Sequence, residues 1–140
     1  MSRRRAVASL AAAALVTASL SLVAGTLPAR ADDAYNRCID ESDGTNAAWA
    51  ACGSDYVARA DKALNTTWKR VYGATEGQTK ADLLAAQRAW IAFKETACAF
   101  YANGDWGREG EVLGYPACVA RIIEARTTDL EAYGDLFQGE

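Results

Sequence analysis

The chain has 140 residues, of which 51% are hydrophobic, so it is long enough for one folded domain. Its formal net charge is −3, and it contains no histidine. An acidic chain repels nucleic acid and anionic lipid, and the lack of histidine removes the commonest general base. We therefore expect neither a nucleic-acid partner nor a histidine-dependent hydrolase.

Residues 1–31 have the order of a secretory signal peptide. Three arginines at residues 3–5 precede an apolar run over residues 6–25, and residues 29–31 read Ala-Arg-Ala, a small-x-small cleavage pattern. The apolar run is also long enough to span a bilayer, so an uncleaved membrane anchor is the alternative. We expect cleavage after residue 31, which gives a secreted or periplasmic protein with no membrane segment after cleavage.

The mature domain, residues 32–140, is more acidic than the whole chain. Removal of residues 1–31 takes away four arginines and leaves 11 basic side chains against 18 acidic ones, a net charge of −7. Such a domain attracts basic proteins, and this attraction weakens as salt is added.

The mature domain begins with a polar, turn-rich stretch, residues 32–46, which we predict to be a loosely structured N-terminal arm. Residues 47–72 follow as the first long helix, in which Gly53 is a local weakness. The helix is predicted because its apolar side chains recur at steps of three and four. These side chains are Trp49, Cys52, Tyr56, Ala60, Leu64, Trp68 and Val71.

Two further helices are predicted, over residues 80–101 and 117–133. Thr79 is the expected capping residue of the first of these. The segment between them, residues 103–116, contains four glycines and is predicted to be an ordered surface loop, and the chain should fray after the last helix. No alternating strand pattern occurs, so the sequence predicts an all-α fold: a three-helix bundle with a short N-terminal arm, stapled by two disulfides.

All four cysteines lie in the mature domain, at Cys38, Cys52, Cys98 and Cys118. An even number of cysteines behind a signal peptide indicates disulfides. We predict the pairs Cys38–Cys52 and Cys98–Cys118, because both loops are short. The pairs Cys52–Cys98 and Cys38–Cys118 are the alternative. No metal site and no cofactor are expected, since the chain has neither a CxxC motif nor a histidine.

Four polar residues fall on the predicted helices where they can meet: Asp61 and Asn65 on the first, Gln87 on the second and Arg126 on the third. One interpretation is a ligand pocket between the helices. The other is a hydrogen-bonded polar network in the core, which we expect because buried polar groups need partners and such networks fix the register of helices.

The predicted loop offers a candidate partner-binding surface. Trp106 lies there among charged side chains, Asp105, Arg108, Glu109 and Glu111. An exposed tryptophan often anchors a protein partner. The alternative is that Trp106 covers the cystine end of the bundle.

Parts of this sequence resemble the lysozyme inhibitor LprI-type N-terminal domain family. Residues 61–65 resemble its D-x-x-L-N signature, and residues 83–98 resemble its second signature, Leu-x-x-x-Gln-x-x-Trp followed by a charged pair and a cysteine. Cys118, Arg126 and Leu130 match its third helix. The resemblance covers about residues 38–130. One departure is Lys94-Glu95, which stands where Arg-Asp is usual and so lacks the planar guanidinium fork.

The resemblance implies a small helical domain that is secreted or periplasmic, in a family named after a lipoprotein with lysozyme-inhibiting activity. We therefore expect a bacterial, non-catalytic binding module that inhibits a peptidoglycan hydrolase, with a basic lysozyme-like enzyme as its partner. Two alternatives remain. One is a cell-envelope structural or stress-response protein without a hydrolase partner, and the other is a small glycan-active enzyme that uses carboxylates.

Overall fold

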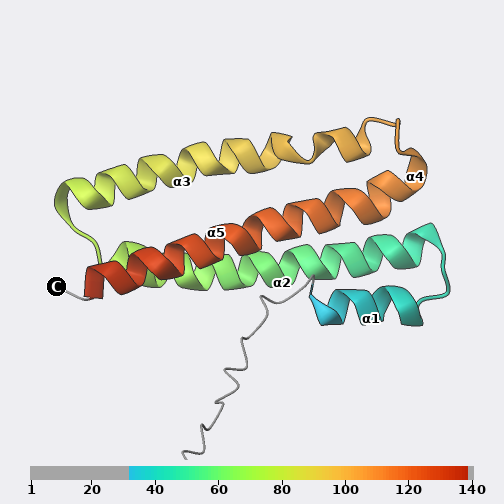
Figure 1. Cartoon of the computed structure of the whole chain (residues 1–140), viewed down its shortest axis with the longest axis horizontal. Coiled ribbons are helices and arrows are strands. Elements are labelled where there is room, and N and C mark those ends of the chain that lie inside the picture. Colours follow the sequence, from blue (N-terminus) through green and yellow to red (C-terminus); the bar gives the residue numbers. More distant parts are fainter. Residues whose placement is uncertain (1–31, 139–140) are drawn as a thin grey trace, which may run out of the picture.

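The computed structural model describes residues 32–138, and the predicted signal peptide lies outside them (Figure 1). These residues form helices and no strands, which confirms the all-α class. The structure has four long or medium helices rather than three, together with short helical turns. In chain order the elements are α1 Asp33–Glu41, α2 Asn46–Gly73, α3 Gly77–Ala97, the 3-10 helix η1 Ala99–Ala102, α4 Gly107–Glu109, the π-helix η2 Gly110–Gly114 and α5 Tyr115–Gln138.

Helices α2 and α5 run in the same direction and form the centre of the fold, with α1 along α2 and with α3, which runs the opposite way, beyond α5 (Figure 1). The core consists mainly of side chains from these two central helices; its largest fully buried members are Tyr56, Val71, Cys98, Ile123 and Leu130. Helix α3 buries only Leu83 and Gln87 among its 21 residues, so it is attached to the centre over a small area. No helix among residues 32–138 combines the length and the hydropathy that crossing a membrane requires.

The predicted loose arm is in fact helix α1. Asp32 caps it, since its carboxylate accepts a hydrogen bond of 2.8 Å from a backbone N–H in the first turn. Tyr35 is buried and stacks on Tyr56 of α2, with 5.0 Å between the ring centroids. An isolated helix of nine residues is marginal in water. Contacts with α2 therefore stabilise α1, which is why local sequence alone did not predict it.

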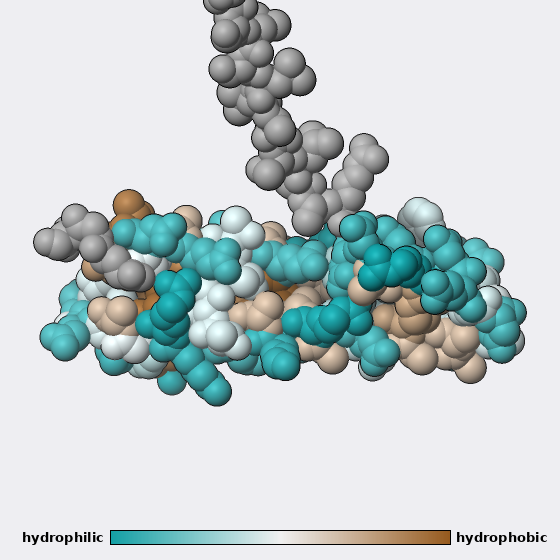
Figure 2. Space-filling view, turned by 90° about the horizontal axis from the view of Figure 1, so that it is seen from below, coloured by the Kyte–Doolittle hydropathy of each residue, from teal (hydrophilic) through white to brown (hydrophobic). Residues whose placement is uncertain are grey.

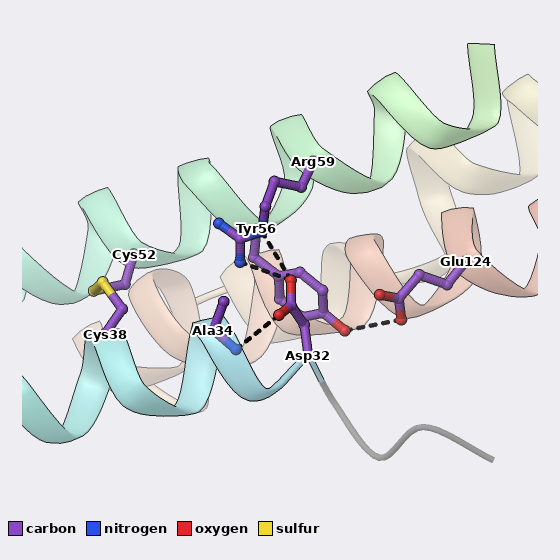
Figure 3. Close-up of polar contacts among 7 residues, drawn as sticks. All are labelled: Asp32, Ala34, Cys38, Cys52, Tyr56, Arg59 and Glu124. Atoms are coloured by element: carbon purple, nitrogen blue, oxygen red, sulfur yellow. Dashed lines mark hydrogen bonds and ion pairs between the residues drawn. A yellow bond between two sulfur atoms is a disulfide. The ribbon is translucent and has the colours of Figure 1, made fainter. Parts of the chain in front are cut away.

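Helix α1 is fastened to α2 at both of its ends (Figure 3). At one end Asp32 forms an ion pair of 2.7 Å with Arg59, and toward the other end Cys38 is bonded to Cys52. The Arg59 side chain is about half exposed, so the ion pair adds less than about 1 kcal/mol. The disulfide and the apolar packing are therefore the main attachments.

The buried Tyr56 hydroxyl links α2 to α5, because it donates a hydrogen bond of 2.9 Å to the Glu124 carboxylate (Figure 3). Burial, together with this carboxylate, raises the pKa of Tyr56 to about 12. An unfolded tyrosine has a pKa of about 10. Because the folded pKa is the higher one, the stabilisation is complete below pH 10 and is lost as the pH rises through 12.

We therefore expect Tyr56→Phe to flatten the dependence of the free energy of unfolding on pH between about 10 and 12. Urea unfolding at a series of pH values measures this dependence. Tyr133→Phe is the control, because Tyr133 is an exposed tyrosine. A Tyr56→Phe protein with the same slope as wild type over this window would contradict the assignment.

The two disulfides are Cys38–Cys52 and Cys98–Cys118, the pairing expected from the short loops. Their Cα atoms are 5.7 and 5.9 Å apart. Cys52 is near the start of α2, Cys98 directly follows α3 and Cys118 is in the first turn of α5. Both disulfides therefore lie in the half of the molecule that carries α4 (Figure 1).

The predicted loop over residues 103–116 is largely helical, and this corrects the expectation from its glycines. Helix α4 continues through the π-helix into α5, which begins two residues earlier than predicted and runs to residue 138 instead of fraying after 133. Pro116 explains the π-helix: its ring would collide with the carbonyl four residues back in a regular α-helix. The wider π turn directly before α5 gives the proline room within one continuous helical path.

The break between α2 and α3 is also shorter than predicted. Helix α3 begins at Gly77, so Thr79 lies inside the helix and does not cap it. Gly77 has φ +54°, a conformation that glycine adopts without strain. Residues 74–76 together with Gly77 therefore make the turn, which is shorter than the break of residues 73–79 expected from the sequence.

Gly53 permits the close approach of α2 and α5, and is not merely a weak point in α2. A Cβ atom at Gly53 would lie 2.6 Å from Cγ of Pro116, which is part of a rigid ring. We expect Gly53→Ala to destabilise the fold by about 1–3 kcal/mol through overpacking. Urea unfolding followed by circular dichroism measures this. Gly73→Ala is the control, because a Cβ there meets no atom within 4 Å; equal stability of the two variants would contradict the account.

The surface of the domain is mixed in character. The face shown in Figure 2 carries many hydrophilic side chains with smaller apolar patches between them. Large exposed hydrophobic side chains are found on α3 and near both ends of the molecule: Ile91, Phe93, Phe100, Trp106, Tyr133 and Leu136. The aromatic members near α4 belong to the candidate site.

Candidate functional site

The predicted polar network reduces to a buried pair between α3 and α5. Arg126 donates from Nε to Oε1 of Gln87 at 2.9 Å, and both residues are only 8% exposed. Asn65 is exposed on α2 and Asp61 is half-buried beside a groove, so neither joins the pair. The structure therefore shows a buried pair where the sequence predicted one network of four residues.

The guanidinium of Arg126 is not fully satisfied. Its Nη2 atom is buried and has no hydrogen-bond partner among residues 32–138, and the centroid of the Tyr133 ring lies 5.9 Å from Cζ. Burying a cation costs desolvation free energy, and a single hydrogen bond to a neutral amide offsets only part of this cost. The pair lies where α3 meets α5 and forms a buried hydrogen bond between these two helices.

The stronger candidate for a binding surface lies at the end of the molecule near α4. We call it the cystine pole, and define it by Phe100, Tyr101, Asp105, Trp106, Arg108, Glu109 and Glu111. Trp106 is 59% exposed and Phe100 is 48% exposed. The rings form a row: 4.3 Å separates the centroids of Phe100 and Tyr101, and 5.6 Å separates those of Tyr101 and Trp106. This exposure favours an anchor over a lid.

Two glycines hold this aromatic row in place. A Cβ atom at Gly110 would lie 2.6 Å from the carbonyl oxygen of Tyr101 and would collide with Cβ of Trp106, so these segments touch directly. Gly110 also donates its backbone N–H to the carbonyl of Trp106 at 3.2 Å. A Cβ at Gly114 would lie 2.5 Å from the ring of Tyr101. The aromatic row is therefore positioned by close backbone packing.

The charged side chains of the cystine pole surround the aromatic row with net negative charge. Arg108 forms an ion pair of 2.5 Å with Glu111, and both side chains are about half exposed or more. Asp105 exchanges hydrogen bonds of 2.9 and 3.2 Å with Asn103, and Glu109 is exposed. Arg108 must give up its bond to Glu111 if it is to reach an acidic group on a partner.

A groove of about 610 Å³ opens between α2 and the start of α5 and adjoins the cystine pole. It was not found from the sequence, because its two walls are about 50 residues apart in the chain. Three of its lining residues had been singled out in the sequence: Asp61 in the D-x-x-L-N pattern, and Arg108 and Glu111 in the candidate partner-binding segment. The groove is lined by Ala50, Ser54, Val57, Ala58, Asp61, Arg108, Glu111, Val112, Tyr115, Pro116 and Val119.

The chemistry that these sites offer is that of surface recognition. Within residues 32–138 no group of His, Cys, Asp and Glu side chains is arranged to hold a metal ion. The cystine pole and the α2–α5 groove instead combine apolar contact area with a few charged groups, the usual composition of a protein-binding surface.

The model of one protein family, described as lysozyme inhibitor LprI, matches residues 38–130. This range contains all four cysteines, the Gln87–Arg126 pair, the cystine pole and the residues that line the groove. Neither a search of curated proteins nor a search of solved structures finds a match for the chain.

Proposed function

The chain belongs to the lysozyme inhibitor LprI family, and we propose from this that it is an exported, non-catalytic module that binds and inhibits a basic lysozyme-like hydrolase. The observation that supports the cystine pole as the binding surface is the exposure of Trp106 among acidic side chains. Tryptophan is among the residues that contribute most to protein interfaces.

The cystine pole is built to lose little entropy on binding. The disulfide Cys98–Cys118 restrains both ends of the segment that carries the aromatic row, and the close packing of Gly110 restrains its middle. A surface that is ordered before it meets its partner binds more tightly than one that must become ordered.

Charge complementarity supports a basic partner. The cystine pole has three carboxylates and one guanidinium, and the mature domain carries −7 overall. Opposite charges on two proteins accelerate their encounter and orient it, with a strong dependence on salt. We expect the pole to cover the substrate cleft of the hydrolase, with Asp105, Glu109 and Glu111 facing its cationic groups.

Export is part of the proposal. Disulfides persist in oxidising compartments such as the periplasm and the extracellular space. The two disulfides and the family therefore support the predicted removal of residues 1–31 and a secreted or periplasmic location.

We expect Trp106→Ala to weaken binding to a c-type lysozyme by about 1–2 kcal/mol, which is a rise of roughly 5–30-fold in Kd. Calorimetric titration at low and at high salt measures both the affinity and its electrostatic part. The control is Leu136→Ala, which removes a side chain that is 70% exposed at the far end of α5. The thermal unfolding of both variants should match wild type, because neither side chain is in the core.

Two outcomes would count against the proposal. No binding of the wild-type domain at low salt would exclude this hydrolase as the partner. Equal affinities of wild type and Trp106→Ala would place the interface elsewhere. Turnover of peptidoglycan by the purified domain would instead favour the glycan-active enzyme. The absence of both lysozyme binding and turnover would favour the structural protein.

A further inference from the structure

We infer that the α2–α5 groove is a second contact site, which receives a lysine or arginine side chain carried on an apolar segment of the partner protein. The identity of that partner rests on the proposed function, but the groove's preference for a cation with an apolar stem does not. The groove is distinct from the aromatic row, and shares only Arg108 and Glu111 with the cystine pole.

The floor of the groove is apolar and fixed in shape. Val57 on α2, Val112 in the π-helix and Val119 on α5 line it, and Pro116 of α5 packs against α2 at Gly53. The contact between Gly53 and Pro116 sets the spacing of α2 and α5, while the π turn places Val112 in the wall. At about 610 Å³ the groove is within the range of small-molecule sites, and so has room for several side chains.

The charge in the groove favours a cation. Its charged lining residues are Asp61 on the α2 side and the Arg108–Glu111 ion pair on the other. The ion pair is internally neutralised, whereas Asp61 forms no ion pair or hydrogen bond with any residue of the described chain. A half-buried carboxylate beside apolar surface is complemented by a cationic group on an aliphatic stem, as in lysine and arginine.

The position of the groove allows one partner to occupy both surfaces. Arg108 and Glu111 line the groove and also belong to the cystine pole, so the two are continuous. A basic protein anchored on Trp106 would therefore extend its contact toward Asp61. The partner would then be bound by Trp106 and its neighbours near α4 and, in addition, by the Asp61 carboxylate on α2.

The first experiment tests the groove without any lysozyme. Hexylammonium is titrated into the protein, and the shifts of backbone amide signals of residues 57–61 and 112–119 are followed by two-dimensional NMR. Hexanol is the neutral matched ligand. We expect hexylammonium to bind at these residues about 3–10-fold more tightly than hexanol, and Asp61→Asn to remove that difference. Asp55→Asn is the control, because Asp55 is an exposed carboxylate of the same helix.

The second experiment tests the partner. Ala58→Trp fills the groove from an exposed position on α2, and Asp61→Lys reverses its charge. We expect each to raise the Kd for c-type lysozyme by about tenfold or more, in addition to the effect of Trp106→Ala.

The outcomes separate the inference from the proposed function. If hexylammonium leaves the groove signals unchanged, or binds wild type and Asp61→Asn equally, the groove inference is overturned whatever lysozyme does. If hexylammonium binds as expected but wild type does not bind lysozyme, the proposed function fails and the cation site stands. If lysozyme binds wild type and both groove variants equally, the assignment of this partner to the groove is overturned.

Discussion

Replacing Cys98 and Cys118 by alanine is expected to lower the free energy of unfolding by about 3 kcal/mol, as the chain-entropy model gives for a loop of this length. The two cysteines are 20 residues apart and join the end of α3 to the start of α5. Helix α3 buries little else than Leu83 and Gln87. The loss should therefore release the second half of α3 together with the cystine pole.

The matched control is the removal of the other disulfide, Cys38–Cys52, whose cysteines are 14 residues apart. The loop model gives a similar loss of about 3 kcal/mol, but α1 and not α3 is then released. Urea unfolding compares the stabilities, and amide hydrogen exchange shows which helix loses protection. Equal protection of α3 in the two variants would contradict this division, as would a stability within 1 kcal/mol of wild type.

Arg126→Ala is expected to lower the free energy of unfolding by about 2–4 kcal/mol. The substitution empties a buried volume and leaves the amide of Gln87 without its partner. Gln87→Leu should be comparably costly, because it leaves a buried cation with no hydrogen bond. Arg88→Met is the control, because it removes an exposed arginine next to Gln87 on α3, and it should change the free energy of unfolding little.

The double substitution Gln87→Leu with Arg126→Met decides how the pair acts. Since Nη2 of Arg126 already lacks a partner, an apolar pair of similar volume should restore most of the stability lost in the single variants. Chemical unfolding of wild type, Gln87→Leu, Arg126→Met and the double variant gives the coupling energy. If Arg126→Ala unfolds at the same temperature as wild type but loses a binding activity, the pair belongs to a ligand pocket and not to the core.

The long helices were predictable because their apolar residues repeat over many turns. The stripe from Cys52 to Val71 identified α2, and the pairs Cys38–Cys52 and Cys98–Cys118 were predicted from loop length. Helix α1 was not predicted because tertiary contacts stabilise it. The sequence did hold a signal for it: Cys38 and Ile39 follow Tyr35 by three and four residues, and Asp32 precedes them as a capping residue. The π turn was not predicted because it arises only when the helix continues through Pro116, whose ring would otherwise collide with the carbonyl four residues back.

The candidate site was predictable in part. Gln87 and Arg126 were expected to be buried, and Trp106 was placed on a surface segment from its charged and glycine-rich neighbours. Asn65 was misplaced, because a step of four residues fixes that two side chains share a helix face but not which neighbour the face meets. The α2–α5 groove could not be predicted, since it depends on the relative rotation of two helices distant in sequence.

The most direct test of the central claim is the initial rate of peptidoglycan hydrolysis by a c-type lysozyme as a protein of residues 32–140 is added at low salt. Inhibition through the cystine pole predicts a saturable fall in rate, with Trp106→Ala requiring roughly 5–30 times more protein for the same fall. A rate unchanged by an excess of the wild-type domain would contradict the claim.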